Sequence, residues 1–543
     1  MVCPRTRPAA NGDSGEKETF LTDTANPYDA TPYPPLSYAD THPDHLATVA
    51  TLLGFEPPPV DDCSVLEIGA AGGGNLIPMA DGLPGSRFVG LDYSAVQIAS
   101  ANDAVSALAL DNARFVCADI RSMDLGPGQF DYIIAHGIYS WVSPEVRDEL
   151  LAACSRLLSP KGVAYISYNT YPGWHSLSAV RGMMLHGSKH AAGPRATVEA
   201  AVETLQFLRT HSEPDSPLAA YFNLYSELEN SGDLMEGAQS DALLLHDLLS
   251  EYNDPAYYHE FVAHAGRHGL GVFADADFPS MFPRGISAET IAELSRRVDS
   301  RIDLEQQFDF LLDRTFRKSL LARDISALNP SIRPSAELLR PLRVRTRAKM
   351  ETPFDISGET PASLVAATGA RVSTDHPLSK AVVAELAEAA PASLPFDDLL
   401  MRATNRLDEP LRAQAMGADI AAVVAANLLQ GFISHPELVV FGTTQQHFAA
   451  RPSAYPQANR VARYFATTGA PTVTNAHHDR VRVEPVHAAI MSLLDGQRDR
   501  SQIRTELDQL IQLPDGSPND PKSLDDLIDQ TLNSFAAAAL LSA

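Results

Sequence analysis

A glycine-rich stretch near the start of the chain holds the residues best suited to bind a nucleotide. An apolar run, residues 64–68, contains Glu67 and leads directly to Gly69 and Gly73. The run is too short for a helix and is typical of a buried parallel strand that turns sharply into one. Glycines permit a positive φ and a close ligand approach, and the next helix offers free N–H groups. The stretch therefore predicts a site for a nucleotide-like ligand, although a tight turn also needs glycine for steric reasons.

Two acidic residues end the apolar runs that follow. Asp92 closes residues 88–92 and comes 19 residues after Gly73, near the ~20 expected for a carboxylate that binds ribose hydroxyls. Asp119 closes a third run, residues 114–119. Because parallel strands end at the same edge of a sheet, we expect both carboxylates beside the glycine-rich turn.

The apolar runs also predict the sheet that positions these residues. Runs at 130–135 and 163–167 follow the first three, and helix-like stretches such as 148–158 lie between runs. This alternation predicts a doubly wound α/β sheet that binds its ligand at the carboxyl ends of its strands. Residues 269–273 and 315–323 are expected to form a sixth and a seventh strand.

These motifs resemble class I S-adenosylmethionine (SAM) methyltransferases. The resemblance rests on the glycine turn, the two acids and a Leu-x-Pro-x-Gly turn at residues 158–162. It implies that Glu67 and the glycine turn hold the methionine end of SAM, that Asp92 binds ribose and that Asp119 with Ile120 holds adenine. A dinucleotide dehydrogenase, the competing interpretation, has no need for an acid after the third strand. The cofactor-binding residues expected in full are Glu67, Gly69, Ala70, Gly73, Asn75, Asp92, Tyr93, Asp119, Ile120 and His136.

One position departs from the family pattern. The family often has Gly-x-Gly-x-Gly, and this chain has Ala71 in place of the middle glycine. The backbone at this position must therefore accommodate a Cβ atom.

Aromatic residues gather after the predicted fourth and fifth strands. The two tryptophans of the chain, Trp141 and Trp174, follow these strand ends, with Tyr139 and Tyr171 close by in sequence. Loops at this edge line the ligand cleft, and aromatic faces attract a sulfonium or ammonium group by ~0.5–2 kcal/mol. We therefore predict that these four residues line a substrate channel, with loop packing as the alternative.

A segment rich in proline and aromatic residues, 33–43, precedes the predicted nucleotide domain. Two interpretations stay open. The segment folds over the cofactor, with Tyr38, Thr41 and His42 as candidate contacts, or it is an arm that packs on the sheet.

Longer motifs resemble a narrower bacterial group. They are Tyr38-x-x-Thr41-His42-Pro43, residues 136–142, residues 168–174, residues 251–261 and Arg314-Thr315-Phe316-Arg317. The group consists of methyltransferases with a methyltransferase regulatory domain, and it is similar to the rickettsial lysine methyltransferases that modify outer-membrane proteins. The resemblance implies protein-lysine N-methylation and a C-terminal winged helix.

A lysine must lose its proton before it can accept a methyl group, and an apolar channel would lower the pKa of the amine by desolvation. No general base can be assigned from the sequence. Two alternatives stay open. One is a small-molecule N-, O- or C-methyltransferase, and the other is a SAM-binding scaffold without turnover.

The charge and cysteine content limit the partners and the location. The 543 residues include 42 Lys and Arg and 68 Asp and Glu, a net charge of −26. Since nucleic-acid binding needs a basic face, we expect no nucleic-acid partner and favour a cationic one such as a lysine-rich protein. Four scattered cysteines predict a reduced, cytoplasmic protein, and no apolar stretch is long enough to span a membrane. A homodimer is one option for its assembly.

Two histidine pairs have the four-residue spacing that places both rings on one helix face. They are His186 with His190 and His264 with His268. Each pair encloses a glycine, and neither contains the Glu of His-Glu-x-x-His. We therefore expect structural or surface histidines and no metal.

Changes in composition and pattern predict five parts of the chain. These are a disordered tail (1–30), a class I methyltransferase domain (31–330) with a helical regulatory insertion at about 176–256, a linker (331–372), a helical middle domain (373–450) and a winged-helix-like C-terminal domain (451–543).

Overall fold

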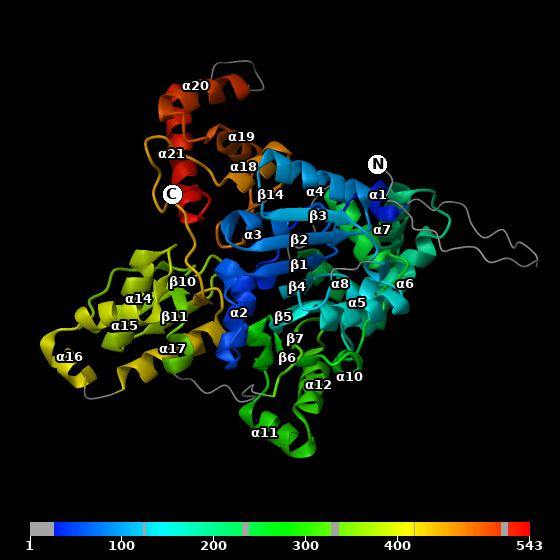
Figure 1. The fold of residues 1–543 in the computed structure, drawn as a ribbon, viewed down its shortest axis with the longest axis horizontal. Coiled ribbons are helices and arrows are strands. Elements are labelled where there is room, and N and C mark those ends of the chain that lie inside the picture. The colour runs from blue at the N-terminus through cyan, green and yellow to red at the C-terminus, as the bar shows by residue number, and fades with distance from the viewer. Residues whose placement is uncertain (1–25, 123–125, 231–237, 327–335, 417–418, 512–519) are drawn as a thin grey trace, which may run out of the picture.

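The structure is a computed structural model that describes residues 26–122, 126–230, 238–326, 336–416, 419–511 and 520–543. At its centre lies a seven-stranded sheet with the order β3-β2-β1-β4-β5-β7-β6 (Figure 1). The strands are β1 (Ser64–Ile68), β2 (Arg87–Asp92), β3 (Ala113–Cys117), β4 (Phe130–Ala135), β5 (Leu158–Asn169), β6 (Gly271–Asp275) and β7 (Phe316–Ala322). Strands β1 to β5 pair in parallel, whereas β7 is antiparallel to both β5 and β6. The predicted sixth and seventh strands are confirmed.

Helices cover both faces of this sheet. One face packs against α2 (Pro43–Leu52), α3 (Leu76–Gly82) and α4 (Ala95–Ala107), and the other against α5 (Pro144–Leu157) and α10 (Tyr258–Arg267). Because side chains alternate along a strand, Tyr132 and Ile134 of β4 lie in the first core and Ile133 and Ala135 in the second. The predicted doubly wound α/β sheet is confirmed.

A helical block lies between β5 and α10. It contains α6 (Trp174–Ser188), α7 (Pro194–His211), α8 (Pro217–Asn230), α9 (Ala238–Leu243) and a π-helical turn (Leu244–Leu248). Its own core includes Trp174, Met184, Leu205 and Tyr225. Two further helices, α11 (Ala288–Arg297) and α12 (Arg301–Leu312), connect β6 to β7.

The segment before α2 is folded from residue 26, where the described residues begin. The predicted tail, residues 1–30, lies outside the described residues up to position 25, but residues 26–30 contain α1 (Pro27–Ala30). The side chain of Asn26 accepts a hydrogen bond from the N–H of Tyr28, and Ser94 donates to Asp29 at 2.6 Å. These local bonds order the end of the predicted tail.

The predicted linker, residues 331–372, is folded in its described part. It contains α13 (Ala336–Leu339), β8 (Arg343–Arg345), β9 (Lys349–Met350), β10 (Ala362–Val365) and the start of β11 (Arg371–Thr374). Val344 and Leu364 are buried in these strands, so the interpretation as a solvated linker is wrong. The strands are so short that each buries only a few apolar residues.

The rest of this middle region is mostly helical, as predicted. It contains α14 (Pro377–Ala389), β12 (Leu394–Pro395), α15 (Phe396–Asn405), α16 (Glu409–Met416), α17 (Ile420–Ser434) and β13 (Val440–Gly442). Strand β8 pairs with β12 and β13, and β10 pairs with β9 and β11.

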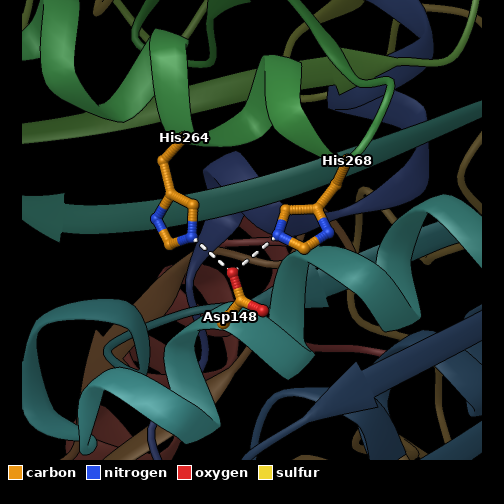
Figure 2. A group of neighbouring side chains, drawn as sticks. All are labelled: Asp148, His264 and His268. Carbon is orange, nitrogen blue, oxygen red and sulfur yellow. Dashed lines mark hydrogen bonds and ion pairs between the residues drawn. The ribbon is translucent and has the colours of Figure 1, made fainter.

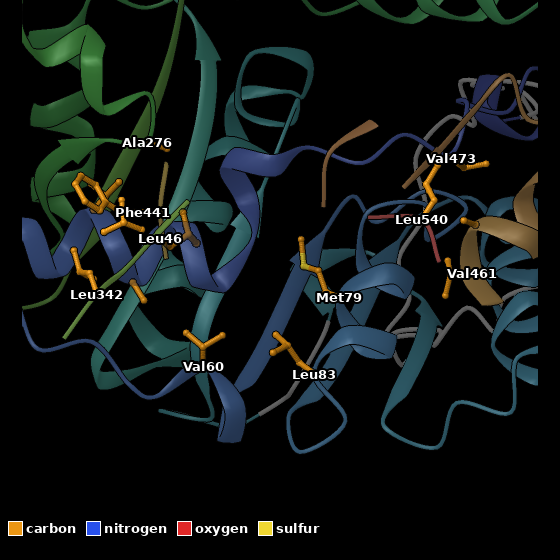
Figure 3. Close-up of a cluster of buried hydrophobic side chains, with 14 of the residues drawn as sticks. Leu46, Val60, Met79, Leu83, Ala276, Leu342, Phe441, Val461, Val473 and Leu540 are labelled. Carbon is orange, nitrogen blue, oxygen red and sulfur yellow. The ribbon is translucent and has the colours of Figure 1, made fainter. Parts of the chain in front are cut away.

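The last region contains, among its described residues, four helices and a short hairpin of two strands. Its elements are α18 (Arg460–Thr467), β14 (Thr472–Thr474), β15 (Arg480–Arg482), α19 (Pro485–Leu493), α20 (Arg500–Leu510) and α21 (Pro521–Ala537). A single hydrophobic cluster joins both C-terminal regions to the sheet. Figure 3 shows Leu46 of α2 and Met79 of α3 in the same cluster as Phe441 and Val461. The C-terminal regions therefore pack on the α2–α3 side of the sheet.

Candidate functional site

The glycine-rich turn after β1 has a backbone that depends on its glycines. Gly69 has φ +79° and Gly73 has φ +77°. A Cβ on Gly69 would lie 2.1 Å from Cδ1 of Ile138. Ala71 adopts φ +45° despite its Cβ, and its N–H donates to Oδ2 of Asp92 at 2.9 Å. This hydrogen bond stabilises the left-handed conformation at the position where the family often has glycine.

Asp92 joins the end of β2 to this turn. Its Oδ2 accepts from Ala71, and its Oδ1 accepts from the N–H of Ser94 at 2.8 Å. Burial raises the pKa of the Asp92 carboxyl above its usual range. Each carboxylate oxygen can accept a second hydrogen bond. The neighbouring Tyr93 side chain is 64% exposed, at the rim of the turn.

Glu67 and Asn75 form a buried polar pair below the turn. Nδ2 of Asn75 donates to Oε1 of Glu67 at 2.7 Å. Oε2 of Glu67 is buried and accepts no hydrogen bond from the described residues. Burial raises the pKa of Glu67 to about 7. A buried polar atom without a partner is costly, so Oε2 is a ready acceptor for a ligand N–H or ammonium group.

We expect Glu67→Gln to make the protein more stable than the wild type above about pH 7. The pKa of Glu67 is about 7 in the folded protein against an ordinary 4.5. The stability that its protonated form contributes is complete below pH 4.5 and is lost as the pH rises through 7. Gln cannot ionise, so the gain at high pH should approach about 3 kcal/mol.

Urea unfolding of both proteins at about pH 5 and about pH 8 measures this difference. Glu289→Gln, on the exposed face of α11, is the matched control. If wild type and Glu67→Gln changed stability equally between the two pH values, the buried ionisation would be refuted.

The N-terminal arm, defined here as residues 33–42, lies on the glycine-rich turn. A Cβ on Gly74 would lie 2.2 Å from the carbonyl carbon of Pro35. The N–H of Tyr38 donates to Oδ1 of Asn75 at 2.9 Å, and Nδ2 of Asn75 donates to Oγ1 of Thr41 at 2.9 Å. This geometry favours the interpretation of the arm as a cover over the cofactor turn.

The β14–β15 hairpin, residues 472–482, also reaches this turn. Nε2 of His478 lies 2.9 Å from Oδ1 of Asn75, and Thr474 donates to Ser37 at 2.9 Å. The guanidinium of Arg480 lies 5.5 Å from the ring centroid of Tyr38. Sequence reasoning missed this contact, because His478 lies in a turn-like stretch 403 residues after Asn75 and no local signal connects them.

The residues expected at adenine, Asp119 and Ile120, follow β3, and His136, another residue expected at the cofactor, follows β4. Arg121 donates to both carboxylate oxygens of Asp119 and holds its pKa below the usual range. Ile120 lines a small apolar cavity with Leu66 and Leu91. The ring of His136 packs against Tyr38 with centroids 3.8 Å apart and an angle of 31° between the ring planes. Burial lowers the pKa of His136 to about 3, so its imidazole is neutral.

The four aromatic residues predicted to line one channel have different surroundings, although Tyr171 packs against the cluster that contains Trp174. Tyr139 is 3% exposed, and its hydroxyl lies 2.8 Å from Nδ1 of His264, on the α10 side of the sheet. Trp174 is buried in the core of the helical block. Trp141 and Tyr171 are half-buried, and Tyr171 stacks on His175. Tyr139 and Trp174 are therefore packed in hydrophobic cores, and a channel lined by the four residues stays a prediction.

Asp247 is a candidate that sequence reasoning missed. Trp141 Nε1 donates to its carbonyl at 3.1 Å, and Asn253 Nδ2 donates to the same carbonyl at 2.9 Å. No described residue donates a hydrogen bond to its carboxylate, and burial raises its pKa to about 7. The adjacent His246 stacks on Tyr28 of α1 at 4.1 Å. The only sequence signal was a lone acid in an apolar run, which is a weak one.

Asp247 and the end of β2 flank the same short helix. On one side of Tyr28, Asn26 donates to the carbonyl of Tyr93 and Asp29 accepts from Ser94. Burial is the main reason why the pKa of Tyr28 rises to about 12, and the negative charges of Asp247 and Asp92 act in the same direction. The carboxyl of Asp247 therefore lies within electrostatic range of the same tyrosine as Asp92.

None of the described helices is both long and apolar enough to cross a membrane. Three family models match the chain. They are a methyltransferase domain at residues 65–162, a predicted methyltransferase regulatory domain at 240–323 and the C-terminal winged helix domain of PKMT at 454–540. The last match confirms the predicted winged-helix-like C-terminal module.

Similar proteins come from Rickettsia. The chain is 32% identical over 485 residues to the uncharacterised protein RP789 of Rickettsia prowazekii, covering 88% of this chain and 85% of that protein. It is 35% identical over 238 residues to RP028 of the same organism, covering 44% and 93%. The solved structure of PKMT2 from Rickettsia typhi in complex with AdoHcy is 27% identical, with a TM-score of 0.80 over 94% of this chain and all of that chain.

Proposed function

Because the chain belongs to the class I SAM-dependent methyltransferases that carry a methyltransferase regulatory domain, we propose that it methylates lysine side chains of proteins. The observation that carries the proposal is the similarity to PKMT2, which extends over 94% of the chain and includes the C-terminal winged helix. A shared methyltransferase domain would explain the similarity at residues 65–162 but not the similarity at the C-terminal winged helix. SAM is the cofactor, and it supplies a methyl group on a cationic sulfur.

The residues of the glycine-rich turn fit this cofactor. The unpaired Oε2 of Glu67 is placed to accept from the ammonium group at the methionine end. Asp92 holds the turn through Ala71 and has acceptor capacity left for ribose hydroxyls. At the adenine end, Asp119 can accept a hydrogen bond from the adenine amino group if Arg121 releases one of the two carboxylate oxygens that it now bonds. These roles are proposals that the geometry supports.

His478 is expected to act as a positioning residue for SAM binding. His478→Asn should raise the Kd for SAM about 10-fold, because Asn75 would lose one of the partners that hold it against Glu67. Asn suits the left-handed backbone at this position, where φ is +63°, so the turn itself should persist.

Isothermal titration of SAM into both proteins gives the affinity, and steady-state rates give KM and kcat. The effect should fall on KM for SAM and leave kcat nearly unchanged. His376→Ala, an exposed histidine before α14, is the control. An unchanged SAM affinity in His478→Asn would show that the hairpin contact has no part in cofactor binding.

We propose that Asp247 serves the acceptor side of the site. A carboxyl with a pKa of about 7 and no described donor suits a group that holds a lysine ammonium and takes its proton. Asp247→Asn should lower kcat about 10-fold or more with SAM affinity unchanged. The control is Asp299→Asn, which changes an exposed acid between α11 and α12 in the same way. Equal kcat in wild type and Asp247→Asn would remove Asp247 from the mechanism.

The test of the function is the transfer of radiolabelled methyl from SAM to fractionated lysate of the source cell. Base-resistant label in particular protein bands, mapped to lysine, would support the proposal. Label only in the small-molecule fraction would identify a metabolite methyltransferase, and SAM binding without any transfer would identify a scaffold. A cytoplasmic location and a homodimer stay predictions.

A further inference from the structure

Three side chains, from α5, α10 and the residue directly after α10, converge on one point on the α5–α10 side of the sheet (Figure 2). Oδ1 of Asp148, on α5, lies 3.1 Å from Nε2 of His264 and 2.8 Å from Nε2 of His268. His264 lies on α10 and His268 follows its last residue. One ligand atom from each of the three residues lies within 4.8 Å of the other two.

These atoms have the types and spacing that a transition-metal ion requires. Zinc binds imidazole nitrogen and carboxylate oxygen at about 2.0–2.2 Å, which places neighbouring tetrahedral ligands about 3.3 Å apart. The separations of 3.1 and 2.8 Å are a few tenths of an ångström short of this. Small rotations of exposed Asp148 would be enough to open the space, since 59% of its side chain is exposed.

The ring of His264 is held in the orientation that a ligand needs. Its Nδ1 lies 2.8 Å from the hydroxyl of Tyr139, so Nε2 is the nitrogen that faces Asp148. Metal-binding histidines almost always use their second ring nitrogen in a hydrogen bond that orients the ring. A tyrosine hydroxyl can accept from Nδ1–H, so this contact is compatible with the tautomer that leaves Nε2 free for a metal. This contact also gives buried Tyr139 a role.

We propose that Asp148, His264 and His268 bind a divalent transition-metal ion, with Zn²⁺ as the preferred ion. Three protein ligands leave a fourth position open to water, because the exposed Asp148 keeps the site accessible to solvent. The site shares no residue with the glycine-rich turn and does not rest on the proposed lysine substrate.

The site would connect two parts of the protein. Asp148 falls within the segment that matches the methyltransferase domain, whereas both histidines fall within the segment that matches the regulatory domain. A bound ion would therefore cross-link α5 to α10 and restrict movement between them. The sequence predicted no metal here because the carboxylate comes from α5 and not from a Glu between the histidines.

The test is Zn²⁺ binding to the full-length chain after chelator treatment and dialysis, followed by competition with a chromogenic chelator. We expect saturable binding with one ion per chain and a Kd of about 1 μM or lower. Co²⁺ as a probe should give the strong visible absorption of a four-coordinate site.

Variants separate this site from other metal binding. Asp148→Asn should weaken Zn²⁺ binding at least about 10-fold, the double change His264→Ala with His268→Ala at least about 100-fold, and Tyr139→Phe about 10-fold. The double change His186→Ala with His190→Ala is the matched control, since this pair has the same spacing. Circular dichroism is the check that each variant is folded. Asp148→Asn also preserves the size of the side chain.

Two results would overturn the proposal. The first is the lack of saturable wild-type binding below about 100 μM Zn²⁺. The second is equal Zn²⁺ affinity in the wild type and in both Asp148→Asn and the His264/His268 variant. Neither result depends on methyl transfer, so failure here and failure of the proposed function are distinguishable.

Discussion

Asp92→Ala is expected to raise the Kd for SAM at least about 100-fold. The carboxylate has two tasks in our proposal, because it binds ribose hydroxyls and also accepts from the N–H of Ala71 at 2.9 Å. Hydrogen bonds to a charged group are each worth about 1.5–3 kcal/mol. Removal of the carboxylate therefore costs direct contacts and frees Ala71 from its left-handed conformation, which is unfavourable for a residue with a Cβ.

Isothermal titration calorimetry with SAM and with AdoHcy measures the loss. Asp92→Asn should fall between wild type and Asp92→Ala, because its amide oxygen retains one acceptor while the charge is lost. Asp103→Ala, exposed on α4, controls for the removal of an acid from a protein of net charge −26. Wild-type affinity in Asp92→Ala would refute the assignment of this acid to the cofactor.

Arg317→Ala is expected to destabilise the protein by about 3–5 kcal/mol. Arg317 is buried in β7 and bonds to Asp309 at 2.7 and 2.9 Å and to Glu305 at 3.1 Å. Asp275 of β6 lies 3.8 Å away, and the guanidinium lies 4.0 Å from the ring centroid of Tyr258. Loss of the guanidinium would leave three buried carboxyl groups short of a cation, with Arg314 the remaining partner of Asp309 at 3.2 Å.

Urea unfolding monitored by circular dichroism measures this loss. Arg317→Lys keeps the charge but not the fork of donors, so it should lose only part of the stability and remain measurable if Arg317→Ala does not fold. Arg297→Ala, which removes an exposed pair with Glu293, should change stability by less than about 0.5 kcal/mol. A change below about 1 kcal/mol in Arg317→Ala would contradict the expected cost of breaking a buried ion pair.

The sequence predicted the central sheet because its strands have strong local patterns. Residues 64–68 and 130–135 are nearly continuous apolar runs, and both are buried on two faces of a parallel sheet. The strands β8, β9 and β10 have only two to four residues each. A single buried side chain such as Val344 or Leu364 gives no period to detect, so this region was interpreted as a linker.

In the candidate site, too, features set by nearby residues were predicted, whereas contacts between residues far apart in the sequence were not. The spacing of Gly69, Gly73 and Asp92 predicted the turn, because the two glycines lie in one strand-to-helix connection and Asp92 ends the neighbouring strand. The partners of Asn75 come from positions 37 residues earlier and 403 residues later, and no local pattern encodes them. For Tyr139, its place after β4 was predicted, but the face it would take depends on packing against α10.

The contact between His478 and Asn75 has a consequence for the order in which the enzyme is made. The ribosome releases the glycine-rich turn early, whereas the hairpin that contacts it lies 403 residues further along the chain. A chain still under synthesis therefore has the turn without its last partner. The contacts of Asn75 are therefore completed only near the end of translation, and a product that ends before the hairpin lacks the contact with His478.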